Sequence, residues 1–100
     1  MKPRKPALDL DAAEWVAIHA LTFLAGDANR LGRFLSLTGI GPADLAAGRS
    51  EPHLQAAVLE YLLSDEPLLL EFSANHNQLP DTIQTAWDLL TLEAHRRTRA

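Results

Sequence analysis

Four histidines are the side chains of this sequence best suited to proton transfer or metal binding: His19, His53, His76 and His95. Imidazole titrates near neutral pH and is a common metal ligand, but two ligands on one helix must lie three or four residues apart. No two of the four histidines have that spacing. The sequence therefore predicts no metal site. We interpret His19, which lies in the most apolar stretch, as a core histidine that is hydrogen-bonded through one nitrogen.

The other candidates for catalysis are acids and serines. Asp65 and Glu66 are adjacent, but consecutive side chains on a helix point about 100° apart, and Asp65 stands where a helix N-cap is expected. No serine lies in a Gly-x-Ser-x-Gly pattern, and there is no Walker or dinucleotide-binding motif. The absence of cysteine excludes disulfides and thiolate chemistry. We predict no catalytic residue and no cofactor, and an enzyme whose site is assembled only in the fold is the third hypothesis.

A glycine-rich turn and the basic ends of the chain suggest a second hypothesis, a weak nucleic-acid-binding or regulatory module. A Gly-apolar-Gly turn such as Gly39-Ile40-Gly41 can present backbone amides to a phosphate, and the helix that follows adds its dipole. The simpler interpretation is that the glycines and Pro42 end one helix and begin the next. This hypothesis requires Arg30, Arg33, Arg49 and the C-terminal arginines to share one face. Its candidate phosphate contacts are Gly39, Gly41, Arg96, Arg97 and Arg99.

The charge distribution disfavours that hypothesis. The net charge is −4, but residues 6–95 hold all 13 acids and only three arginines, while the remaining cations lie at the two ends. An acidic body repels phosphate backbones. No uncharged apolar stretch reaches the roughly 20 residues of a membrane span. We therefore expect a cytoplasmic protein whose partner is another protein or a second copy of itself, rather than nucleic acid or a membrane.

The composition and the helix signals predict an all-α fold. Alanine (16) and leucine (19) dominate the apolar residues, and both favour helices over strands. We expect a compact orthogonal bundle of five or six short helices around an apolar first helix. N-caps are expected at Asp11, Asp27, Ser50 and Asp65, and glycine ends at Gly26, in the left-handed conformation, Gly39 and Gly48. The expected helices cover 12–25, 28–38, 42–47, 51–63, 66–75 and 80–97.

These helices form one domain over residues 11–97, between a flexible basic tail at 1–10 and a basic end at 98–100. The expected core consists of apolar residues at helical spacing: Trp15, Ile18, Leu21, Phe34, Leu35, Leu54, Val58, Phe72, Ile83, Trp87 and Leu90.

A surplus of leucine supports the leading hypothesis, a non-enzymatic protein–protein interaction or adaptor module. Three successive leucines spread over about 200° of a helix surface, so they cannot all face one core. Either the helices that carry the surplus are covered by neighbours, or one face is left for a partner. The candidate interaction surface comprises Leu68, Leu69, Leu70, Leu89 and Leu92.

Two stretches carry a family resemblance. They are Leu31-Gly-Arg-Phe-Leu-Ser-Leu-Thr-Gly-Ile-Gly-Pro-Ala-Asp-Leu45 and Val58-Leu-Glu-Tyr-Leu-Leu-Ser-Asp-Glu-Pro-Leu-Leu-Leu-Glu-Phe72. Together they resemble a family of bacterial proteins about one domain long, known only as a domain of unknown function. The likeness covers most of residues 14–90, and the Asp65-Glu66 step before the leucine triplet is its most distinctive part. It implies a short, stand-alone bacterial protein, and it brings no activity, cofactor or catalytic residue.

Overall fold

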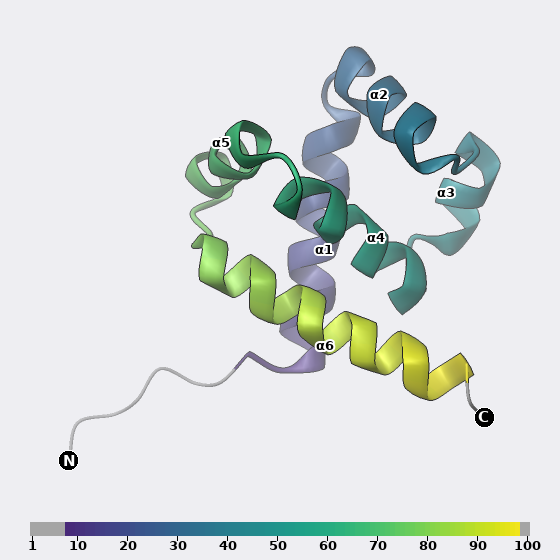
Figure 1. The fold of residues 1–100 in the computed structure, drawn as a ribbon, viewed down its shortest axis with the longest axis vertical. Coiled ribbons are helices and arrows are strands. Elements are labelled where there is room, and N and C mark those ends of the chain that lie inside the picture. Colours follow the sequence, from purple (N-terminus) through teal and green to yellow (C-terminus); the bar gives the residue numbers. More distant parts are fainter. Residues whose placement is uncertain (1–7, 99–100) are drawn as a thin grey trace.

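The computed structural model describes residues 8–98, in which every regular element is a helix. This confirms the all-α fold (Figure 1). The six helices are α1 (Leu10–Ala25), α2 (Ala28–Thr38), α3 (Pro42–Gly48), α4 (Pro52–Leu63), α5 (Glu66–His76) and α6 (Pro80–Thr98). None of these helices is long and apolar enough to cross a membrane.

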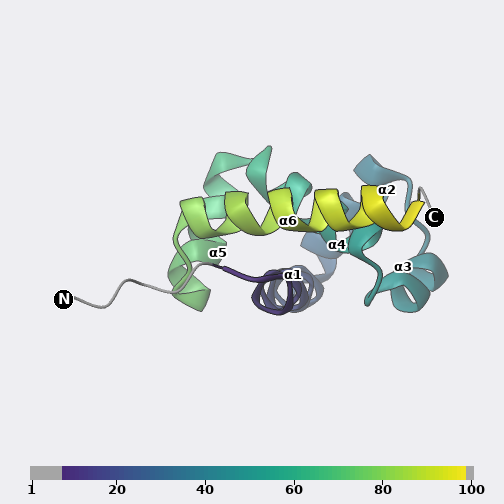
Figure 2. The ribbon, with the colours of Figure 1, turned by 90° about the horizontal axis from the view of Figure 1, so that it is seen from below.

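The helices form two layers. Figure 2 shows α1 on one side of the molecule and α6 on the other, and Figure 1 shows that the two cross. α4 packs against both α1 and α6, while α2 and α5 also contact α1. The expected central position of the first helix is therefore confirmed, although α4 is equally central. The core between the layers is apolar, with Phe34, Phe72, Leu59, Ile83 and Leu90 fully buried.

The face of α1 that enters the core is made of small side chains. Ala13, Ala17 and Ala20 are at most 1% exposed, with Val16 and Leu24 beside them on the same stripe. Alanine lets two helix backbones approach closely, because almost no side chain separates them. The sequence-based core was wrong at two positions of this helix, since Trp15 is 59% and Ile18 38% exposed. They lie on the face of α1 opposite its alanines.

Asp27 and Asp65 cap α2 and α5 as predicted. The Asp27 carboxylate accepts hydrogen bonds from the backbone N–H groups of Asn29 and Arg30, and Asp65 accepts one from Leu68. Gly39 ends α2 in the left-handed conformation, with φ 76°. Each of these residues satisfies backbone groups that a helix end would otherwise leave without a partner.

Three predicted helix ends were wrong. Asp9, not Asp11, caps α1, because the Asp9 carboxylate accepts the Ala12 N–H at 2.8 Å and the helix begins two residues earlier than expected. α4 starts without a side-chain cap after Glu51, not Ser50, since Pro52 occupies its first position and needs no N–H partner. Gly26 ends α1 in the right-handed region, at φ −71°.

The domain also extends into part of the expected N-terminal tail, because Leu8 and Leu10 pack against the core. α6 continues to Thr98, one residue beyond its predicted end. The rest of the expected tail, residues 1–7, lies outside the described residues, as does Arg99.

Candidate functional site

A hollow of the surface lies between α2 and α4. α2 packs on α1, and Phe34 reaches Tyr61 of α4 edge-on at a ring distance of 5.1 Å. Beyond that contact the short α3 carries the chain away from α4 and back (Figure 1). The end of α2 and the side of α4 with Ala57 and Tyr61 border this hollow.

Two adjoining concavities, each of about 430 Å³, form this hollow. They share Ala57, so we treat them as one feature, the α2–α4 groove. Its lining comes from four successive segments of the chain. The lining residues are Leu37, Thr38, Gly39, Ile40, Asp44, Gly48, Glu51, His53, Leu54, Ala57, Glu60, Tyr61 and Ser64.

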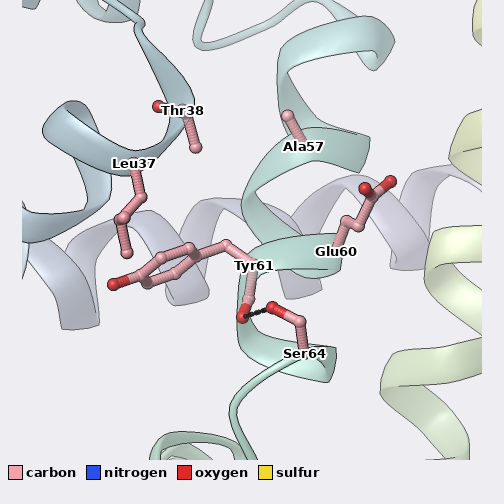
Figure 3. Close-up of a pocket in the computed structure, with 6 residues that line it drawn as sticks. All are labelled: Leu37, Thr38, Ala57, Glu60, Tyr61 and Ser64. Carbon is pink, nitrogen blue, oxygen red and sulfur yellow. Dashed lines mark hydrogen bonds between the residues drawn. The ribbon is translucent and has the colours of Figure 1, made fainter.

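The floor of the groove is apolar and one wall carries an exposed leucine. Figure 3 shows Leu37 and Thr38 on α2 opposite Ala57 and Tyr61 on α4, with the Tyr61 ring lying between the two helices. Leu37 is 66% exposed, among the highest values for a large apolar side chain in residues 8–98. The Ser64 hydroxyl donates to the Tyr61 carbonyl at 2.8 Å (Figure 3), which completes the last turn of α4.

The loop at the closed end of the groove is held by a buried amide. Gln55 is 4% exposed, and its side-chain nitrogen donates to the Arg49 carbonyl at 3.0 Å. This bond ties the turn after α3 to the first turn of α4. Gly48 lies directly against Leu54, where an added Cβ would meet the leucine at 3.5 Å.

All the formal charge that lines the groove is negative. Asp44, Glu51 and Glu60 are exposed, and none of them forms an ion pair within residues 8–98. The lining contains no lysine or arginine, and His53 is its only other titratable group apart from Tyr61. Walls of low dielectric around such a cleft concentrate its negative potential.

Comparison of the chain with known proteins identifies its family but no characterised relative. The family described as "Protein of unknown function (DUF3572)" matches residues 10–92. The chain belongs to this family. Comparison with curated proteins and with solved structures finds no match. The predicted resemblance to a family of unknown function is thus confirmed.

Within this family member, the leucine surface expected on α5 and α6 is divided by the packing. Leu68, Leu69 and Leu89 are partly buried against the core. Leu70 is 52% and Leu92 66% exposed. The triplet on α5 therefore turns two leucines inward and one outward, as the angular spread of a helix requires. Leu92 lies twelve residues into α6, roughly 18 Å from its start.

The turn proposed for phosphate contact uses part of its backbone in hydrogen bonds of its own. The Gly39 N–H donates to the Leu35 carbonyl at 2.9 Å, and the Ile40 N–H to the Thr38 hydroxyl at 3.3 Å. A Cβ at Gly41 would lie 3.5 Å from the Asp44 carboxylate, so a phosphate at this turn would meet a negative charge. The turn therefore lies in the wall of an acidic groove, which does not suit an anion.

The nucleic-acid hypothesis also required several arginines to share one face, but three of them form ion pairs with acids on different helices. Arg96 and Arg97 both bind Glu93 on their own helix, at 2.6 Å and 2.7 Å. Arg30 pairs instead with Glu71 of α5, and its guanidinium lies 4.5 Å from the centre of the Phe23 ring.

Glu93 is the one carboxylate with a clearly displaced acidity. Its side chain is 9% exposed, and Arg96 donates hydrogen bonds to both of its carboxylate oxygens. Hydrogen bonds from Arg96 and then Arg97 lower its pKa from 4.5 to about 2, and raise the pKa of Arg96. The cluster binds the last turns of α6 to each other and leaves this carboxylate ionised at neutral pH.

His19 was wrongly expected to be a core residue. It is exposed on the outer face of α1, between Trp15 and His76, with ring centres 5.8 Å away on each side. His76 packs in turn on Phe72, at 4.7 Å. His19 is exposed for the same reason as Trp15, because both side chains lie on the face of α1 opposite its alanines. Neither His19 nor His76 lines the groove.

Sequence reasoning missed the groove because its lining comes from four segments whose relative angles no local pattern encodes. One signal was present. His53, Ala57, Tyr61 and Ser64 recur at helical spacing on α4, and they form a stripe of small, polar and amphipathic side chains beside the fully apolar one. Such a stripe marks the face of α4 that no helix covers.

Proposed function

We propose that this chain is a non-enzymatic protein-interaction module, which receives a segment of a partner protein in the α2–α4 groove. The observation that carries the proposal is the unpacked space between α2 and α4, with its apolar floor and the exposed Leu37 on its wall. Exposing leucine to water is unfavourable, so a fold that keeps one beside an apolar trough gains free energy when the trough is filled.

The shape of the groove supports a macromolecular partner over a small substrate. Most of its lining residues are exposed, so it is an open trough. Sites for small molecules enclose most of the ligand surface, which an open trough cannot do. A chain segment held along its length needs no such enclosure, because it gains its contacts from many side chains.

The charge of the groove supports a protein over a nucleic acid. Asp44 and Glu60 line it from opposite sides of Ala57, and the phosphate-binding turn considered above forms part of the same acidic wall. Phosphate groups would be repelled along the whole trough. A second copy of the chain, which is itself acidic, is disfavoured for the same reason.

Two leucines of equal exposure allow a matched test. Leu37 lies in the groove and Leu92 on α6 outside it, and both are 66% exposed. We would capture partners from the native cell at low salt with the wild-type chain, Leu37→Asp and Leu92→Asp, and then rebind each partner as a purified protein. The proposal expects a partner that Leu37→Asp loses and Leu92→Asp retains, with both variants folded by circular dichroism.

Two outcomes contradict this proposal. If Leu37→Asp retains every partner of the wild-type chain, the groove is not the binding site. If Leu92→Asp alone loses the partner, binding takes place on the exposed leucines of α5 and α6, as the sequence suggested.

A further inference from the structure

The carboxylates of the groove identify the chemistry of the segment that would fill it. Asp44 comes from α3, Glu51 precedes α4, and Glu60 lies two turns into α4, so the charges are spread along the trough. In an acidic chain, unpaired carboxylates that line the same trough add charge repulsion to the folded state. A cationic occupant would remove that repulsion, and salt would weaken its binding.

Three of the five arginines in residues 8–98 form ion pairs away from the groove, while Arg33 and Arg49 form none and line neither concavity. Arg30 pairs with Glu71, and the two arginines at the end of α6 pair with Glu93. Arg49 lies in the loop before Glu51, but its side chain is not part of the lining. The negative potential of the groove is thus left for an external partner.

The length and the backbone chemistry of the groove favour a helical occupant. Its stripe on α4 runs from His53 to Ser64, about 16 Å along the helix axis, which matches three helical turns. An extended peptide normally binds by adding a strand to the open edge of a sheet. Residues 8–98 contain no strand, so the walls of the groove offer no row of free backbone groups for that mode. A helix satisfies its own backbone and needs only a groove for its apolar side chains.

We infer that the α2–α4 groove binds a cationic amphipathic helix of a partner protein. This inference rests on the proposed function. The apolar face of the helix packs on Leu37, Ala57 and Tyr61, at positions spaced i, i+3 or i+4 and i+7. Lysine or arginine side chains on its flanks reach Asp44 on one side and Glu60 on the other.

Synthetic peptides test the chemistry directly. The first would be an amphipathic leucine–lysine helix of about four turns. The second has glutamate in place of every lysine, and the third has the first peptide's composition in shuffled order. Each is titrated into the isotope-labelled full chain, with amide shifts and calorimetry as readouts. The first peptide alone should bind, with shifts at Thr38, Ala57 and Tyr61 and weaker affinity at higher salt.

A charge reversal in the groove and a matched reversal outside it complete the design. Glu60→Lys should weaken the leucine–lysine peptide about tenfold or more. Glu66 is an exposed residue of α5 outside the groove. Glu66→Lys changes the net charge as much as Glu60→Lys does and should leave the peptide affinity close to that of the wild-type chain. Both variants are exposed at the mutated position, and circular dichroism verifies their fold.

Several results would overturn the inference. If the glutamate peptide binds as tightly as the leucine–lysine peptide, the groove does not select a cationic partner. If the shuffled peptide binds as tightly, the groove does not require an amphipathic helix. If Glu66→Lys weakens binding as much as Glu60→Lys, the effect comes from net charge alone. Shifts in the groove that depend on protein concentration alone would make a second copy the occupant. If no peptide binds but Leu37→Asp still loses a cellular partner, the inference fails while the proposed function stands. If Leu37→Asp loses none, both fail.

Discussion

One substitution, glycine to alanine, is expected to act in opposite directions at two positions of α2. Gly32 lies in the middle of the helix, and Gly39 follows its last residue with φ 76° and ψ 6°. A Cβ added at either position meets no other atom within 4 Å. Any difference between the two variants therefore comes from the backbone, not from crowding or from a new contact.

The magnitudes follow from the two conformations. Alanine is favoured over glycine inside a helix by about 1 kcal/mol, so Gly32→Ala should raise the free energy of unfolding by that amount. The left-handed region costs an L-residue about 1–2 kcal/mol. The smaller unfolded-state entropy of alanine offsets about 0.4–1 kcal/mol of this at Gly39. Gly39→Ala should therefore destabilise the chain by about 1 kcal/mol.

Thermal and urea unfolding followed by circular dichroism measure both effects. In a domain of this size, 1 kcal/mol corresponds to about 4–8 °C in Tm, so the two variants should lie about 10 °C apart on opposite sides of the wild type. Gly26→Ala is the control, because Gly26 ends α1 at φ −71°, where alanine fits. If the Gly39→Ala chain is as stable as the wild type, α2 does not end in the left-handed conformation. If the Gly32→Ala chain is destabilised, the surroundings of Gly32 are not open.

Three further predictions concern acidity, capping and the core. The Glu93 pKa of about 2 lies below its unfolded value of 4.5, so this carboxylate stabilises the fold above about pH 4.5 and ceases to do so as pH falls through 2. The urea midpoints of wild type and Glu93→Gln should therefore differ at neutral pH and converge near pH 2, and a difference that persists at pH 2 would contradict the pairing. Asp9→Ala should lower the free energy of unfolding by about 1 kcal/mol in high salt. Asp11→Ala loses only a helix-dipole interaction that salt screens, so it should have little effect there. The reverse order in urea melts would identify Asp11 as the cap. Phe34→Ala should lower the free energy of unfolding by about 3–5 kcal/mol, and Trp15→Ala by less than about 1.5 kcal/mol. Equal losses in chemical denaturation would place Trp15 in the core.

Helices were predictable from the sequence, but which side of each helix faces inward was less so. In α1 nearly every position is apolar, so hydrophobicity alone could not choose between the face with Trp15 and the face with Ala17. Size decided, because the small face allows α4 and α6 to come close. Where apolar and polar residues alternate clearly, as at Phe34 in α2, the inward side was predicted correctly.

The helix ends show a similar limit. Asp9 and Asp11 are both good N-caps two residues apart, and the choice between them depends on where α1 meets the core. Asp65 had no competitor at its position and was predicted correctly.

The groove could not be predicted because its existence depends on an angle between helices. Leu37 and Tyr61 come to line one hollow only because α2 rests on α1 and α3 leads the chain from α2 to α4. Hydrophobic periodicity describes one helix at a time and carries no information on such angles. The leucines of α5 were conspicuous because they are consecutive, whereas Leu37 is a single leucine whose exposure only the fold reveals.

The alanine face of α1 bears on how this family can vary during evolution. A larger side chain at Ala13, Ala17 or Ala20 would wedge α1 away from α4, whose other side forms the floor of the groove. Relatives should therefore keep glycine, alanine or serine at these positions, or enlarge one only together with a smaller side chain opposite it. Positions 15 and 18 are free of that constraint, so sequence divergence along α1 should follow its helical phase.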